Sequence, residues 1–201
     1  TNFSMEAIEQ TFNGSADFGK KVTCTISRNG DLMYRVYLQV TLPSYKLKAT
    51  ESFRWLNWIG HVLIDNVEVE IGGQRMDKQY GQWLHIWNEL TQQPGLQAGY
   101  ANMVGNVPAL TQVYRGLDAE VPQTTLYIPL QFWFCRNPGL ALPLIALQYH
   151  EVKINLEFAP VSNVYWAANC DGQQINCCLN LQAASLYVDY IYLDTDERRR
   201  F

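Results

Sequence analysis

Long hydrophobic runs are missing from this sequence of 201 residues, in which no stretch approaches eighteen consecutive apolar residues. A helix that crosses a bilayer needs about 20 such residues, so we predict no insertion into a membrane. The first six residues also lack the basic start and the apolar centre of a signal peptide. No initiator Met is present, and we expect the chain to be a fragment of a longer protein.

Charged residues are scarce as well. They make up 17% of the chain, whereas about 25% is usual in soluble domains. The net charge is −4 and the pI is near 5.3, which argues against a protein that coats nucleic acid, because such a protein needs a basic surface. The one basic run, 198–200, is interpreted as a solvated linker. We therefore predict no direct contact with nucleic acid.

The spacing of Cys and His residues does not fit a metal site. The five Cys residues include no Cys-x-x-Cys pair, and an odd number without a secretory context is typical of free thiols. His61, His85 and His150 lie far apart in the sequence, with neither His-x-His nor His-Glu-x-x-His spacing. Phosphate-binding loops and nucleophile-elbow motifs are absent too. We predict no metal and no other cofactor.

Apolar and aromatic residues, in contrast, are plentiful. Apolar residues account for 48% of the chain, which contains six Trp, twelve Tyr and eight Phe. This composition excludes a disordered protein, and the length is enough for one domain with a substantial core.

Alternating apolar residues predict a series of β-strands. The clearest rows run over 22–26, 32–42, 67–71, 126–134 and 152–158. Asn29-Gly30 predicts a tight hairpin between the first two rows, and Gly72-Gly73 a turn after the third. Cys24 lies on the apolar side of the first row and is expected to pack in the core.

One segment has helical periodicity instead. Trp83, Trp87 and Leu90 recur at helical spacing within 80–93, before Pro94-Gly95 ends the pattern. The following residues up to 124 have little periodicity and predict a long loop. Many short strands with one inserted helix are typical of a sandwich. We predict an all-β, eight-stranded antiparallel jelly roll with one helix near 80–93 and long loops.

The most informative stretch is an apolar loop that leads into the last of these rows. Prolines interrupt it, so it cannot be a regular central strand. It contains Leu140, Leu142, Leu144, Ile145 and Leu147, and no charge between them. Burying one such side chain contributes about 1.5–3 kcal/mol, so five exposed ones are not expected. The loop must close the domain's own core or pack against another domain or subunit.

The strongest pattern for catalysis is a pair of carboxylates. Glu68 and Glu70 lie two residues apart on a predicted strand, so both project from one face. Jelly-roll glycosidases place an acid and a nucleophile in this way. The favoured interpretation is that both simply face solvent opposite the inward Val67 and Val69. We predict that the protein is not an enzyme.

Four segments of the chain, 1–32, 67–75, 138–158 and 188–198, occur in the same order in a known family. The sequence resembles the major capsid protein of nucleocytoplasmic large DNA viruses, the double jelly-roll family of chlorella viruses and iridoviruses. The resemblance implies that 1–194 is the N-terminal jelly roll of a subunit with two. Residues 195–201 would then begin the linker to a second jelly roll that is absent from this chain.

The same resemblance implies a structural role in the virion. Three subunits would form a homotrimer, the pseudo-hexagonal capsomer, and capsomers would tile an icosahedral shell together with minor capsid proteins. The protein would be made in the host cytoplasm. The interface residues expected on this basis are Leu140, Leu142, Leu144, Ile145, Leu147, Trp83 and Trp87.

Two other functions remain open from the sequence. A lectin-like sandwich could present the 94–124 loop to a glycan or a receptor, because loops on a rigid sandwich commonly bind ligands. A glycoside hydrolase that uses Glu68 and Glu70 is the third hypothesis. Assays of self-assembly, glycan binding and glycan hydrolysis distinguish the capsid, lectin and hydrolase hypotheses, respectively.

Overall fold

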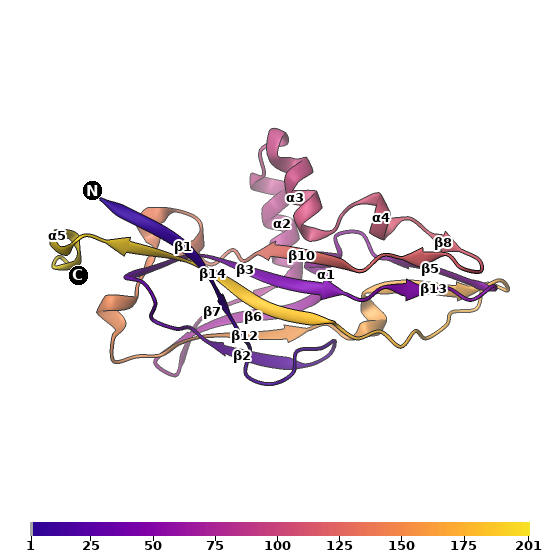
Figure 1. Ribbon diagram of the computed structural model, residues 1–201, viewed down its shortest axis with the longest axis horizontal. Coiled ribbons are helices and arrows are strands. Elements are labelled where there is room, and N and C mark those ends of the chain that lie inside the picture. Colours follow the sequence, from indigo (N-terminus) through magenta and orange to yellow (C-terminus); the bar gives the residue numbers. More distant parts are fainter. Residues whose placement is uncertain (1) are drawn as a thin grey trace.

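The computed structural model describes residues 2–201, which form a sandwich of antiparallel β-sheets with two helices rising from one side (Figure 1). Thr1, where the predicted domain begins, lies outside the described residues. The strands are β1 (Phe3–Gln10), β2 (Lys21–Thr25), β3 (Leu32–Leu42), β4 (Tyr45–Lys46), β5 (Glu51–Trp55), β6 (Ile64–Ile71), β7 (Gln74–Tyr80), β8 (Tyr114–Arg115), β9 (Glu120–Val121), β10 (Thr124–Pro129), β11 (Leu142–Pro143), β12 (Val152–Phe158), β13 (Tyr165–Asn169) and β14 (Ala183–Leu193). The α-helices are α1 (Ile59–Val62), α2 (Gly81–Thr91), α3 (Gln97–Val104), α4 (Pro108–Thr111) and α5 (Thr195–Arg198).

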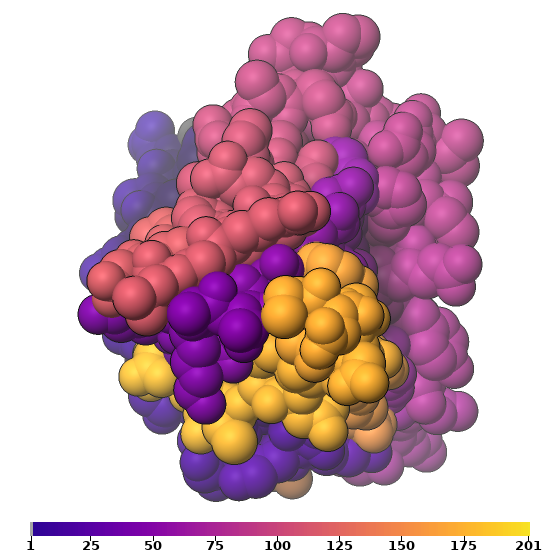
Figure 2. All heavy atoms as spheres, turned by 90° about the vertical axis from the view of Figure 1, so that its right-hand side faces the viewer, coloured from indigo at the N-terminus to yellow at the C-terminus, as the bar shows by residue number. Residues whose placement is uncertain are grey.

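Two large sheets form the layers of the sandwich. One has the strand order β1-β14-β3-β10, with β11 also paired to β3, and the other has the order β2-β12-β6-β7. Smaller sheets, β13-β5-β8 and β4-β9, extend one end of the molecule. In Figure 2, which looks onto that end, the segments near 50, 115 and 170 lie side by side. The two ends of the chain lie together at the opposite end (Figure 1).

The core lies between the two large sheets and follows the predicted alternation, except at the start of β3. There Met33 lies in the main core, and Leu32 and Tyr34 pack in a separate cluster with Ile191, next to an irregularity in the pairing of β3 with β14. Leu38 and Val40 of β3 are fully buried, as are Val67 and Val69 of β6. On β12 the apolar side of the row is buried, and the polar residues between are partly exposed. Cys24 is 0% exposed, and burial raises the pKa of its thiol to about 11. Its predicted place in the core is confirmed.

Two details of the predicted sandwich are wrong. The structure describes fourteen strands rather than eight. The two large sheets contain four strands each along their main paths, and the additional strands are mostly short pairs at the rims. Asn29-Gly30 does not close a hairpin, because β2 pairs with β12, whereas β3 pairs with β10 and β14. The chain passes from one large sheet to the other at this segment. Only glycine fits at position 30, because an added Cβ would lie 2.7 Å from the Cβ of Tyr190.

The helical prediction is correct at α2 and incomplete beyond it. The expected long loop contains α3, α4, β8 and β9. Helix α3 buries Tyr100 and Val104, one turn apart, so its apolar face is too short to give a clear periodic signal. Strands β8 and β9 have two residues each and depend on partners more than sixty residues away. None of the helices in residues 2–201 is long and apolar enough to span a membrane.

Candidate functional site

The apolar loop is divided between core and surface. Residues 138–140 form a short 3₁₀ turn, the two-residue strand β11 pairs with β3, and a second 3₁₀ turn follows over 144–147. Leu142 is 6% exposed and Leu144 is 2% exposed, so both belong to the core. Prolines exclude a long central strand here but permit this short pairing.

The other predicted interface residues of the loop remain accessible. Leu140 is 53% exposed, and Ile145 and Leu147 are half-buried. The end of the loop is held by Arg28, which donates hydrogen bonds to the carbonyl oxygens of Leu147 and His150. The loop is therefore anchored on its inner side and presents Leu140 to its surroundings.

Helix α2 presents the second group of predicted interface residues. The rings of Trp83 and Trp87 lie 5.8 Å apart, and both side chains are half-buried. The guanidinium of Arg136 lies 3.9 Å from the centre of the Trp87 ring. Leu90 is 74% exposed and Ile86 is 41% exposed. We refer to Trp83, Ile86, Trp87 and Leu90 as the α2 face, which is apolar and partly exposed.

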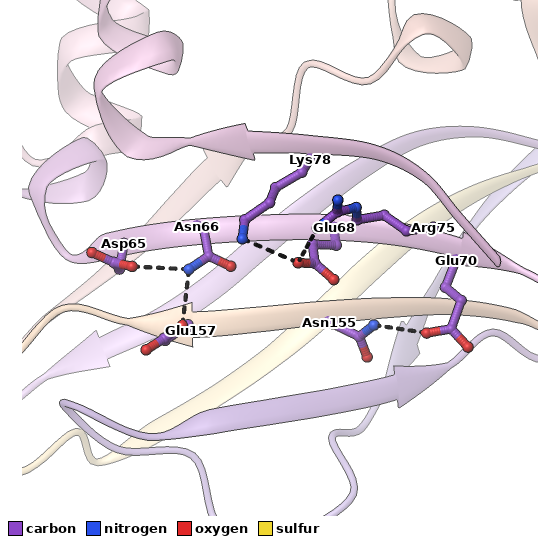
Figure 3. A network of polar contacts seen from close by, with 8 residues as sticks. All are labelled: Asp65, Asn66, Glu68, Glu70, Arg75, Lys78, Asn155 and Glu157. Carbon is purple, nitrogen blue, oxygen red and sulfur yellow. Dashed lines mark hydrogen bonds and ion pairs between the residues drawn. The ribbon is translucent and has the colours of Figure 1, made fainter. Parts of the chain in front are cut away.

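The carboxylate pair lies on the outer face of the β2-β12-β6-β7 sheet (Figure 3). Glu68 forms ion pairs with Lys78 at 3.4 Å and with Arg75 at 3.6 Å. Glu70 accepts a hydrogen bond from the amide of Asn155 at 3.1 Å. Each carboxylate is therefore already paired with groups on neighbouring strands. Such cross-strand pairs stabilise a sheet and need no substrate to explain them.

We expect Glu68→Gln and Glu70→Gln each to lower the free energy of unfolding by less than about 1 kcal/mol. Glu68 pairs with Arg75 and Lys78, which are partly exposed, and such ion pairs contribute little. Glu70 accepts a hydrogen bond from Asn155, which the side-chain oxygen of Gln can also accept. Urea unfolding of the two variants and the parent chain measures this. Hydrolysis of a polysaccharide by the parent chain, abolished by either substitution, would contradict the structural interpretation of the pair.

A cavity of about 540 Å³ lies where α1, the start of α2 and the start of β6 meet. His61 is 2% exposed and stacks in parallel on Trp58, at 5.5 Å between ring centres. Its Nε2 atom lies 2.6 Å from the hydroxyl of Tyr100, and its Nδ1 atom has no hydrogen-bond partner. The ring of His85 is 5.7 Å away. Trp58 holds a left-handed backbone with φ of 56°, which is strained for a residue with a side chain.

Histidines that are far apart in the sequence therefore become neighbours, which spacing alone did not reveal. Among residues 2–201, no group of three or more His, Cys, Asp or Glu side chains is placed to hold a metal ion. Burial, together with the charge of His85, lowers the pKa of His61 from 6.5 to about 4. His61 is thus a neutral core residue at neutral pH.

We expect this burial to make the protein less stable in acid. Above pH 6.5, His61 is neutral in both states and has no effect on pH dependence. As the pH falls from 6.5 towards 4, only the unfolded state takes up the proton, so stability falls. The loss at pH 4.5 should be about 2–3 kcal/mol. Urea unfolding at several pH values measures it, and His61→Gln should show a shallower fall than the parent. Parallel curves would contradict the assignment.

The family described as "Major capsid protein N-terminus" matches residues 1–194. The chain is 60% identical over 201 residues to a major capsid protein of Pyramimonas orientalis virus, covering all of this chain and 47% of the relative. It is 40% identical to the major capsid protein of Paramecium bursaria Chlorella virus 1, covering all of this chain and 42% of the relative.

Solved structures agree with these matches. A quasi-atomic structure of the PBCV-1 virus capsid superposes with a TM-score of 0.79 at 38% identity, covering all of this chain and 45% of that one. The Faustovirus major capsid protein superposes with a TM-score of 0.78 at 12% identity, covering 99% of this chain and 56% of that one, which supports the fold alone. The predicted jelly-roll class is confirmed. The chain spans less than half the length of the curated relatives named above.

Proposed function

The chain belongs to the family of viral major capsid protein N-terminal domains, and from this premise we propose that it is the N-terminal jelly roll of a double jelly-roll capsid subunit. The family match over 1–194 is the observation that carries the proposal. In the virion, three full-length subunits form a homotrimeric, pseudo-hexagonal capsomer. Capsomers contact one another, and minor capsid proteins, in an icosahedral shell. The protein is made in the host cytoplasm.

The proposed domain boundary is supported by the way in which the last strand ends. The family match ends at 194, directly after β14. The carboxylate of Asp31, on a side chain that is largely buried, accepts a hydrogen bond from the backbone of Leu193 at 2.7 Å and pairs with Arg198 at 3.1 Å. These contacts hold the beginning of 195–201 against the domain. We propose that this segment starts the linker to the second jelly roll.

The structure narrows the surfaces that we propose for assembly. Leu142 and Leu144 already pack within the domain, so their contribution is to hold the loop in place. Leu140 is exposed, and the α2 face is apolar, with Ile86 and Leu90 exposed and its two Trp side chains half-buried. Aromatic residues are enriched in protein interfaces, and exposed apolar patches commonly mark them. We propose that these two surfaces pack against the second jelly roll or a neighbouring subunit.

The role that we propose is structural rather than catalytic. The paired carboxylates that suggested a glycosidase are occupied by Arg75, Lys78 and Asn155 on their own sheet. The low content of charged residues, 17%, fits a domain that buries part of its surface in an assembly.

The proposal is tested on the full-length protein. We expect size-exclusion chromatography with light scattering to show trimers, and Leu90→Asp and Leu140→Asp to impair their formation. Both side chains are exposed, so the 201-residue chain carrying either change should still fold. Gln97→Asp, at the start of α3, is the control and should leave trimers intact. Normal trimers from both interface variants would refute these surfaces, and a monomeric parent would refute the capsomer.

A further inference from the structure

A second cavity, of about 510 Å³, opens between α2, α3 and the outer side of β3. Apolar side chains, including Trp87, Leu96 and Met103, line one part of it. Two arginines, Arg35 and Arg136, also line it, beside neutral polar residues such as Gln92 and Gln131. No Asp or Glu is among the residues that surround the cavity. The cavity is therefore partly apolar and carries positive charge, in a chain whose net charge is −4.

Neither arginine has an ion-pair partner within the described part of the chain. Arg35 lies over the ring of Tyr34 at 5.1 Å. Burial raises the pKa of Asp189, and the charge of Arg35 opposes that rise, although the two side chains form no ion pair. Both arginines are exposed residues, and the side chain of Arg35 also hydrogen bonds with Tyr34 and Tyr37. Neither set of contacts supplies a carboxylate, so an anion can still pair with the two guanidinium groups.

Arg136 is also held in place. The central carbon of its guanidinium lies over the ring of Trp87, 3.9 Å from the ring centre. Its Nη2 atom donates a hydrogen bond to the carbonyl oxygen of Gln131 at 3.1 Å. A stacked guanidinium keeps N–H groups at its edge, where a carboxylate can accept two hydrogen bonds. Fixing the side chain beforehand lowers the entropic cost of binding.

We propose that this cavity receives a carboxylate side chain from a second copy of the subunit. This inference rests on the proposed capsid function and names the kind of contact that one neighbour makes with another. Charge complementarity supports it, since each copy carries nineteen Asp and Glu against fifteen Lys and Arg. An acidic chain repels the phosphates of nucleic acid, which disfavours that alternative.

The first test uses the 201-residue chain and a capped peptide of alternating Glu and Gly, followed by NMR of the Trp indole and Arg side-chain N–H groups. We expect binding that weakens with salt and falls about tenfold or more in Arg35→Gln and Arg136→Gln. Arg115→Gln, an exposed arginine on β8, should bind like the parent. The matching Gln–Gly peptide should not bind. Absence of binding by the Glu peptide, or equal binding by all variants, overturns the proposal.

Two further measurements separate the alternatives. Inorganic phosphate that binds as tightly as the Glu peptide would show a general anion site and overturn the assignment to a protein carboxylate. In the full-length protein, Arg136→Glu should weaken assembly between subunits, while the isolated chain, which loses only the surface contacts of Arg136 with Trp87 and Gln131, should stay folded. Unchanged assembly overturns the contact between copies. A parent that does not assemble at all refutes the capsid proposal, while the peptide titration still reports on the cavity itself.

Discussion

Replacing Leu144 with Asp is expected to lower the free energy of unfolding by about 4 kcal/mol or more. Leu144 belongs to the apolar loop, is 2% exposed and packs in the main core. The substitution removes a buried apolar side chain and places a carboxylate among the apolar side chains of the main core. Small domains are stable by only about 5–15 kcal/mol, so this single substitution should remove a large share of the protein's stability. Urea unfolding followed by tryptophan fluorescence measures the change.

Leu140→Asp is the matched control for this experiment. It makes the same chemical change four residues earlier, at a side chain that is 53% exposed. We expect a loss below about 1 kcal/mol, which is usual for surface substitutions. Equal losses in the two variants would show that the loop is not divided between core and surface. The comparison also separates folding from assembly, because only Leu140 belongs to a surface that we propose for subunit contact.

Replacing Gly81 with Ala is expected to destabilise the protein by about 3 kcal/mol or more. Gly81 begins α2, where Gly→Ala ordinarily favours a helix by up to about 1 kcal/mol. In this protein an added Cβ would lie 2.1 Å from the carbonyl oxygen of His61 and 2.2 Å from that of Ile64. Both obstacles are backbone atoms, so no side-chain rotation relieves the clash, and α2 must move away from α1 and β6.

Gly99→Ala provides the opposite result within the same protein. Gly99 lies in α3, and an added Cβ would meet no atom within 4 Å. We expect this variant to be as stable as the parent or more stable by up to about 1 kcal/mol. Thermal unfolding of the two variants provides the comparison. A Gly81→Ala protein as stable as Gly99→Ala would mean that α2 is not packed closely against the backbone of 61–64.

The displaced helix would also affect the proposed assembly surface. Trp83 and Trp87 take their positions from the start of α2, and Arg136 is stacked on Trp87. A shift of α2 should therefore disturb both the α2 face and the cavity that Arg35 and Arg136 line.

Local patterns were enough for much of the architecture. The alternation in 152–158 and 32–42 identified β12 and β3, because side chains on a strand alternate between its two sides. The inward row was correct along β12 and from Val36 onward in β3, but it was wrong at the start of β3. The spacing of Trp83 and Trp87 identified α2 to within two residues of its bounds. These features depend only on neighbours in the sequence. The family resemblance rested on segments spread along the chain, and it was correct.

Periodicity along the chain was therefore enough to predict the sandwich class, its main strands and the helix α2, and the resemblance was enough to identify the family. Two features came only from the packing of the whole domain. One is the division of the apolar loop into core and surface, and the other is that β2 and β3, on either side of Asn29-Gly30, lie in different sheets. The same packing also decided that His61 meets His85, and that Arg35 and Arg136 share one cavity with Trp87. The physical reason is the same in each case. These groups come together through packing between segments far apart in the chain, and periodicity over a few residues carries no information about such distant partners.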